Sequence, residues 1–166
     1  MIKIFAPLYR ILDIPIIYDL LQRTNPATVG LFKDKLIENI KISKAENILD
    51  IGCGTSQFWQ SFQESNYYGI DINLNYVKEA KQSTNGHYAV MNGNKMAYPD
   101  NFFDSAFCVA AFHHMPDEVI VETIKEALRV IKPEGFLHII DLILPESFLK
   151  SPINSFIFHL DRGDFP

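Results

Sequence analysis

Short apolar segments rich in β-branched and aromatic residues alternate with amphipathic segments along the middle of the chain. The strand-like segments are residues 47–52, 67–71, 87–91, 103–112 and 135–144. Between them, residues 75–83 and 116–131 place apolar side chains three and four positions apart, as on one face of a helix. Pro133 prevents the second helix from continuing, and Gly135 is expected to form the turn into the last strand.

This alternation predicts an α/β fold. Strands that alternate with helices pair in parallel through right-handed crossovers, so that helices cover both faces of the sheet. The nearly continuous apolar run 106–112 suits a strand buried on both faces. We therefore predict a Rossmann-like, three-layer αβα sandwich with a mostly parallel sheet. Ligands of such sheets bind beyond the carboxyl ends of the strands, where the strand order reverses.

The length of 166 residues corresponds to one structural domain. We expect residues 1–44 to form an N-terminal helical lid segment and residues 45–166 to form the ligand-binding domain. The apolar stretch 1–21 contains Arg10, Asp13 and Asp19, so no transmembrane segment is predicted there. An amphipathic helix or lid is favoured over docking on a membrane surface.

Charge and cysteine content narrow the function classes. A formal net charge of −5 with scattered basic residues argues against a nucleic-acid partner. Cys53 and Cys108 are too few and too far apart for a disulfide framework or a zinc site. The sequence therefore predicts reduced thiols and a cytoplasmic location.

The segment 48–56 is the most informative, because a buried strand leads directly into Gly52 and Gly54 and a helical pattern follows. Glycines let a ligand approach the backbone, and a helix N-terminus would add N–H donors and partial positive charge. The dinucleotide fingerprint needs a third glycine where Gln57 stands. Asp50 would repel a pyrophosphate but can support an ammonium group. A tight turn without a ligand is the alternative.

Asp71 ends the second predicted strand, seventeen residues after Gly54. An acidic side chain at this place can accept hydrogen bonds from both hydroxyls of a ribose. The alternative role is the N-cap of the following helix, near Asn73.

Five segments together resemble a known family. They are LDIGCGTS, YYGID, NGNKMAYPDNFFD, FCVAAFHHMPD and EALRVIKPEGFLHIID, in this order over residues 45–144. They resemble the class I S-adenosylmethionine-dependent methyltransferases, in particular the small-molecule branch related to ubiquinone and menaquinone biosynthesis enzymes (methyltransferase type 11 domain). The resemblance implies S-adenosylmethionine as cofactor, S-adenosylhomocysteine as product and a small-molecule acceptor. The implied reaction is direct displacement at the sulfonium methyl group.

The resemblance also implies roles for residues of the glycine turn. Asp50 would hold the methionine end of the cofactor through water. Gly52, Cys53 and Gly54 would let the cofactor lie against the backbone. Asp71 would bind the ribose hydroxyls.

Further implied contacts come from later segments. Ile72 would pack on the adenine. Asn92 and Gly93 stand where the family usually has Asp-Ala, and the Asn92 amide oxygen can still accept a hydrogen bond from the adenine amino group. Phe112 and His113, at the end of the fourth strand, would lie below the methionine and sulfonium region.

His113 and His114 invite a catalytic or metal interpretation. Adjacent residues on an extended strand point to opposite faces, so we predict no metal site. His113 is the candidate base toward an acceptor hydroxyl or carbon acid, against a structural or cofactor-lining role. Glu126 and Arg129 match the family's Glu-x-x-Arg and are expected to form an ion pair on the helix surface. The candidate substrate residues are Tyr9, Tyr18 and His114, with packing on the sheet as the alternative for the tyrosines.

Two departures from the family pattern bear on activity. Ser56 stands where a third glycine is frequent. Residues 147–160 are helix-like and the sequence then ends, so strands 6 and 7 of the family's sheet are expected to be missing. The fifth strand would then be a bare edge, through which chains could self-associate.

Two rival functions follow from these features. One is a non-catalytic or truncated module that binds S-adenosylmethionine without transferring its methyl group. The other is a nicotinamide-dependent reductase, which Gln57 and Asp50 disfavour.

Overall fold

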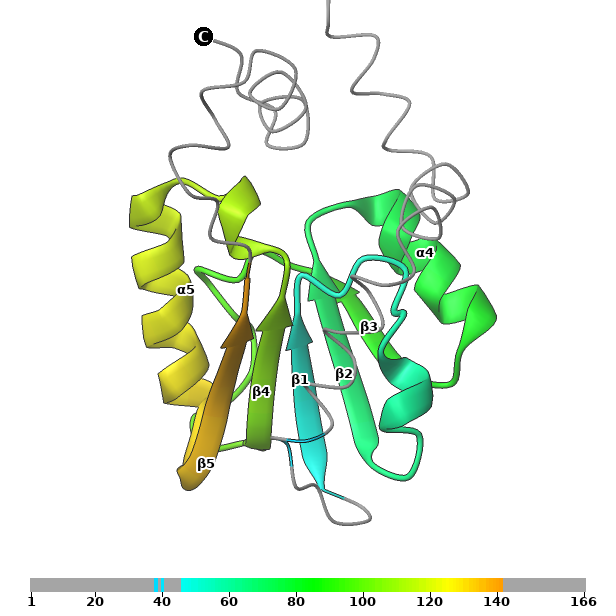
Figure 1. Ribbon diagram of the computed structural model, residues 1–166, viewed down its shortest axis with the longest axis horizontal. Helices are drawn as coiled ribbons and strands as arrows, with labels where there is room; N and C mark the ends of the chain where they lie inside the picture. Colours follow the sequence, from blue (N-terminus) through cyan, green and yellow to red (C-terminus); the bar gives the residue numbers. More distant parts are fainter. Residues whose placement is uncertain (1–37, 39, 41–45, 142–166) are drawn as a thin grey trace, which may run out of the picture.

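Five parallel strands form one sheet in the order β3-β2-β1-β4-β5, and all five arrowheads point to the same edge (Figure 1). This computed structural model describes residues 38, 40 and 46–141. The strands are β1 Asn47–Ile51, β2 Asn66–Asp71, β3 His87–Val90, β4 Phe103–Val109 and β5 Ile131–Ile140. The α-helices are α4 Leu74–Ser83 and α5 Asp117–Val130, and the short 3-10 helices are η1 Trp59–Ser61 and η2 Phe112–His114.

Each face of the sheet is buried under its own helix layer, with α5 on one side and α4 on the other (Figure 1). Alternate residues of β1 divide between these layers, because successive side chains of a strand point to opposite faces. Leu49 packs in the cluster that contains Ala127 of α5, whereas Ile48 packs in the cluster that contains Val77 of α4. The predicted three-layer αβα sandwich with a parallel sheet is confirmed.

The two predicted α-helices are present with nearly the expected bounds. The Asn73 side chain caps α4 by accepting the N–H groups of Asn75 and Tyr76 at 2.9 and 3.4 Å. Pro116 is the N-cap residue of α5, and acidic residues in the first turn complement the helix dipole.

The expected helix behind the glycine turn is wrong. Residues 52–65 form turns and the three-residue η1, so no α-helix directly follows the glycine turn. The turn is held by β2 instead, since the N–H groups of Gly52 and Cys53 both donate to the Ile70 carbonyl oxygen, at 2.8 and 3.0 Å.

The last two strands also differ from expectation. β4 ends at Val109, so Phe112 and His113 lie in η2 rather than at the end of a strand. β5 begins at Ile131, and Gly135 lies within it instead of forming a turn. A Cβ at Gly135 would come 2.3 Å from the Asp104 carbonyl oxygen, next to a shift in the β4–β5 register. Glycine there allows the two backbones to approach closely.

Several predictions lie outside the described residues. They concern Tyr9, Tyr18, the sequence after Asp141 with its missing strands, and most of the lid segment 1–44. Ile40 is described, and it is buried in the cluster on the α4 side. Self-association through β5 stays a prediction. Within the part of the chain that the structure describes, no helix is long and apolar enough to cross a membrane.

Candidate functional site

The glycine turn after β1 has a left-handed backbone. Gly52 has φ +75° and Gly54 has φ +51°, values that glycine adopts without steric cost. A Cβ on Gly52 would come 2.6 Å from the Ala111 Cβ. Ser56 follows with φ +67°, and its hydroxyl shares a hydrogen bond of 2.6 Å with the Tyr88 hydroxyl. The turn therefore fits closely against β2, β3 and the loop after β4.

The Asp71 carboxylate lies at the end of β2, beside this turn. Its Oδ2 accepts the Gly54 N–H at 2.9 Å, and its Oδ1 accepts the Asn73 N–H at 2.8 Å. Because Asn73 itself caps α4, the alternative N-cap role for Asp71 is wrong. Burial raises the pKa of Asp71, while the two N–H donors lower it. The next residue, Ile72, has a side chain that is 73% exposed.

Asp50 is a buried carboxylate under the glycine turn, with 1% of its surface exposed. The Tyr67 hydroxyl donates a hydrogen bond to its Oδ2. The pKa of Asp50 is raised from its ordinary value of 3.8 to about 7, because the effects of burial and of the Asp71 charge together exceed the lowering by the Tyr67 hydrogen bond. Burial also raises the pKa of Tyr67 well above its ordinary range, so this hydroxyl remains a donor.

Cys53 is buried within the turn, and its thiol lies 3.6 Å from the Gly54 carbonyl oxygen. Burial and the neighbouring carboxylates raise its pKa well above the ordinary value. A thiol with a raised pKa is a poor nucleophile, so Cys53 contributes shape to the turn rather than reactivity.

Asn92 and Gly93 follow β3 next to the end of β2, where the Met91 N–H donates to the Asp71 carbonyl oxygen at 3.0 Å. Asn92 is exposed, and its Oδ1 accepts the Asn94 N–H at 3.3 Å. Gly93 is buried against α5, because a Cβ there would meet the Thr123 Cγ2 at 2.9 Å. The two residues thus face different surroundings.

η2 is held by Asp141, a residue that the sequence analysis did not single out. Asp141 Oδ2 accepts the N–H groups of Phe112 and His113 at 2.8 and 3.2 Å, and its Oδ1 lies 2.6 Å from His113 Nδ1. The available signal was one acidic residue within the apolar strand predicted over residues 135–144. The rings of His113 and His114 lie 4.0 Å apart between centroids, so the argument from an extended strand was wrong. In the described ranges, no group of three or more His, Cys, Asp or Glu residues is placed to hold a metal ion.

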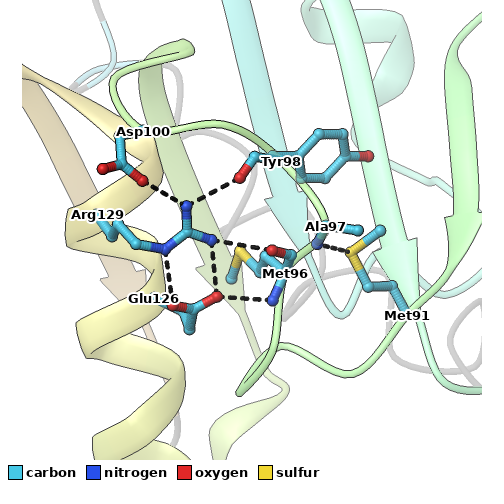
Figure 2. Close-up of polar contacts among 7 residues, drawn as sticks. All are labelled: Met91, Met96, Ala97, Tyr98, Asp100, Glu126 and Arg129. Atoms are coloured by element: carbon cyan, nitrogen blue, oxygen red, sulfur yellow. Dashed lines mark hydrogen bonds and ion pairs between the residues drawn. The ribbon is translucent and has the colours of Figure 1, made fainter.

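Arg129 and Glu126 bind the loop before β4, and do not form a simple surface pair (Figure 2). The guanidinium contacts Glu126 through Nε and Nη2, both at 2.8 Å. It also donates to the carbonyl oxygens of Met96 and Tyr98, each at 2.9 Å, and to Asp100 at 2.7 Å. Glu126 in turn accepts the Met96 N–H at 2.7 Å. These contacts fasten the loop that carries Asn92 to α5.

Comparison with known proteins agrees with this geometry. Residues 49–139, more than half of the chain, match the family described as "Methyltransferase domain". The match runs from β1 into β5 and includes the glycine turn, Asp71 and η2. The chain belongs to the methyltransferase domain family. This membership confirms the resemblance to class I S-adenosylmethionine-dependent methyltransferases.

Two curated relatives are named as methyltransferases of a hydroquinone and of demethylmenaquinone. The chain is 36% identical over 101 residues to "2-methyl-6-phytyl-1,4-hydroquinone methyltransferase" of Synechocystis sp., covering 57% of this chain and 31% of the relative. It is 28% identical over 126 residues to "Demethylmenaquinone methyltransferase" of Bacillus licheniformis, covering 70% of this chain and 53% of that protein. The chain thus spans about half the length, or less, of these curated relatives.

Two solved structures share the fold. The YcgJ protein of Bacillus subtilis matches with a TM-score of 0.64 and 26% identity, over 80% of this chain and 58% of that one. A SAM-dependent methyltransferase of Methanosarcina mazei matches with a TM-score of 0.54 and 28% identity, over 59% of this chain and 53% of that one.

Proposed function

We propose that this chain binds S-adenosylmethionine and transfers its methyl group to a small-molecule acceptor. The observation that carries the proposal is the link between the glycine turn and Asp71, in which the Gly54 N–H donates to the carboxylate at the end of the neighbouring strand. This link lies within the region that matches the methyltransferase domain family.

The donor and acceptor groups of the described residues suit this cofactor. Each Asp71 oxygen accepts one N–H and can accept a further hydrogen bond, here from a ribose hydroxyl. Ile72 offers its exposed side chain to the adenine, and the Asn92 amide oxygen suits the adenine amino group. Asp50 offers a carboxylate to the ammonium group of the methionine end.

When bound, S-adenosylmethionine supplies a methyl group that is already electrophilic because of its sulfonium charge. The residues of the chain contribute alignment and the exclusion of water. Gly52, Cys53 and Gly54 allow close approach to the backbone. The Gly93 backbone, packed on α5, sets the place of Asn92. Phe112, the first residue of η2, is 7% exposed and is proposed to form the floor of the cofactor site.

His113 is the proposed base that takes a proton from the acceptor. Asp141 fixes the orientation of the imidazole through Nδ1 and stabilises the imidazolium that forms when the ring accepts a proton. His114, Tyr9 and Tyr18 are proposed to line the acceptor pocket. One relative is named for a hydroquinone and another for demethylmenaquinone. Because a hydroquinone carries phenolic hydroxyls, phenols are the first class of acceptor to test.

Calorimetry of the purified chain with S-adenosylmethionine and S-adenosylhomocysteine tests the cofactor. We expect micromolar binding, and a loss of at least about tenfold in Asp71→Asn, because one of its charged acceptor oxygens becomes an amide donor. Glu122→Gln, in an exposed ion pair on α5, is the matched control. NADH tests the reductase alternative. Failure of the folded wild-type chain to bind either sulfur compound would refute the proposal.

Methyl transfer to a panel of phenols separates catalysis from binding alone. We expect His113→Gln to lower kcat by about 100-fold or more and to leave the Kd of S-adenosylhomocysteine unchanged. Asp141→Asn should lower kcat in the same direction and move the pH profile of kcat, since the imidazolium loses its carboxylate. Tight cofactor binding without turnover of any acceptor would favour the non-catalytic module.

A further inference from the structure

We propose that Tyr67 is a positioning residue for cofactor binding: its buried hydroxyl anchors one oxygen of Asp50 and so directs the carboxylate toward the ammonium end of the cofactor. This role rests on the function proposed above. It extends that function by assigning recognition of the amino-acid end to a pair of residues, Asp50 and Tyr67.

The strand register explains how Tyr67 reaches Asp50. Asp50 of β1 lies opposite Gly69 of β2, and Tyr67 lies two residues earlier on the same face of β2. Gly69 has no side chain, and the Tyr88 ring and the Cys53 sulfur pack so closely over it that a Cβ there would come 2.6 and 2.8 Å from them. No side chain at Gly69 therefore separates the diagonal neighbour Tyr67 from Asp50, and the Tyr67 hydroxyl donates to Asp50 Oδ2.

A second set of hydroxyls surrounds this pair. The Tyr88 hydroxyl is bonded to Ser56 Oγ at 2.6 Å and to Thr84 Oγ1 at 2.7 Å, and the rings of Tyr67 and Tyr88 lie 6.1 Å apart. Ser56 also forms a side-chain hydrogen bond with Tyr67, so this serine of the turn connects the two tyrosines. The contact with Asp50 Oδ2 is made by Tyr67.

Within the described part of the chain, the titratable groups coupled to Asp50 supply no positive charge. Asp71 and Tyr67 face it from β2, and Cys53 faces it from the turn. Tyr88 of β3 and Cys108 of β4 are also coupled to it. None of these five groups is a cation. A buried carboxylate in such surroundings is costly until a positive group arrives.

The ammonium group of the cofactor would supply that charge, so binding should be linked to ionisation of Asp50. Burial raises the pKa of Asp50 to about 7, and the hydrogen bond from Tyr67 favours the ionised form. Affinity for a ligand with an amino-acid end should then fall as the pH drops below about 7. Affinity for the nucleoside alone should not.

The test is calorimetry with S-adenosylhomocysteine and with adenosine, between about pH 6 and pH 8. We expect wild-type affinity for S-adenosylhomocysteine to fall by up to about tenfold per pH unit on the acid side. Tyr67→Phe should bind it about tenfold more weakly near pH 7, with the fall displaced to higher pH, and should bind adenosine normally. Tyr68→Phe, which removes a hydroxyl from the other face of β2, should match the wild type.

Equal losses for both ligands in Tyr67→Phe, or no loss for either, would overturn the role of Tyr67 alone. Absence of wild-type binding to S-adenosylhomocysteine would overturn the proposed function and this role together. If Tyr67→Phe does not fold, Asp50→Asn decides, because the role requires a flat pH dependence in that variant. A pH slope equal to that of the wild type would overturn it.

Discussion

Residues with a left-handed backbone conformation cluster beside the carboxyl ends of β1 and β4. Gly52, Gly54, Ser56 and Ala110 all have φ between +50° and +75°. Non-glycine residues pay for this conformation, and such strain concentrates at functional sites. The hydroxyl of Ser56 compensates through its bond to Tyr88, which explains how serine is accommodated where the family often has glycine.

Gly52→Ala should destabilise the chain by about 2–4 kcal/mol, because the new methyl group meets the Ala111 Cβ and the backbone is left-handed. Urea denaturation measures the change. Ala110→Gly, at φ +50°, is the converse control and should gain about 0.5–1 kcal/mol. A Gly52→Ala chain as stable as the wild type would contradict the geometry of the turn.

Asp50→Asn should stabilise the ligand-free chain at pH 8. Asp50 is ordinarily ionised above pH 3.8, but in the folded chain its pKa is about 7, so the folded state binds the extra proton. Its contribution to stability is therefore full below pH 3.8, declines as the pH rises and is lost above about pH 7. Thermal melts from about pH 5 to pH 8 should show a steeper decline in the wild type than in the variant. Equally steep declines in the wild type and in Asp50→Asn would refute the assignment of a raised pKa to Asp50.

At the scale of elements, α5 organises the loop between β3 and β4. Besides the contacts of Arg129 and Glu126, the loop closes on itself through the Met91 sulfur, which accepts the Ala97 N–H at 3.3 Å (Figure 2). The loop carries Asn92, and its position therefore depends on a helix that lies thirty residues further along the chain.

Arg129→Ala should release this loop. The variant loses its contacts with Met96, Tyr98 and Asp100, and Glu126 loses its cationic partner. We therefore expect the free energy of unfolding to fall by about 2–3 kcal/mol and the Met96 amide, which donates to Glu126, to exchange faster. Hydrogen exchange measured by mass spectrometry reports both the stability of the domain and the exchange rate at Met96. Lys125→Ala breaks an exposed pair with Glu122 on the same helix and should change stability by less than about 0.5 kcal/mol. Unchanged exchange at Met96 would contradict the role of Arg129 and Glu126 in holding the loop; we call this pair the clamp.

The pH dependence of this clamp follows from Glu126. Its hydrogen bond and charge interaction with Arg129 lower the pKa to about 2 from an ordinary 4.5. The stabilisation is therefore present above pH 4.5 and is lost as the pH falls toward 2.

At the scale of the molecule, β1 lies between β2 and β4, where the direction of the strand order reverses. The carboxyl ends of β1, β2, β4 and β5 therefore bring the glycine turn, Asp71, η2 and Asp141 to one edge of the sheet (Figure 1). Parallel pairing of strands is what makes this convergence possible.

Cofactor binding should consequently protect one edge of the sheet. S-adenosylhomocysteine at about 100 times its Kd should add about 2.7 kcal/mol to the stability. Hydrogen exchange should slow at Gly54, Asn73 and the residues around Asn92, and remain unchanged at the amino ends of the strands, such as Asn47 and Asn66. Protection at the amino ends instead would place the ligand elsewhere.

Much of this site could be predicted because its signals are local. An apolar strand, two glycines and the carboxylate at the end of the next strand are readable in the sequence, and the Gly54 N–H and Asp71 meet as expected. The prediction of a helix after the turn was wrong, although Phe58 and Phe62 are four residues apart and fit a helical pattern. In the structure the two residues flank η1, and their ring centroids lie 6.1 and 5.3 Å from that of Phe107. Burial of the aromatic rings thus outweighed helix periodicity.

The sequence by itself determined the order of the strands along the chain, the α/β class, the glycine turn and the acidic end of β2, because these follow from periodicity and turn chemistry. Only the tertiary structure decided the bounds of β4 and β5 and which distant residues contact one another. Tyr67 with Asp50, Asp141 with His113 and Arg129 with Met96 are 17, 28 and 33 residues apart. Their contacts depend on strand register and on how α5 packs against the sheet, and cooperative packing of the whole domain sets both.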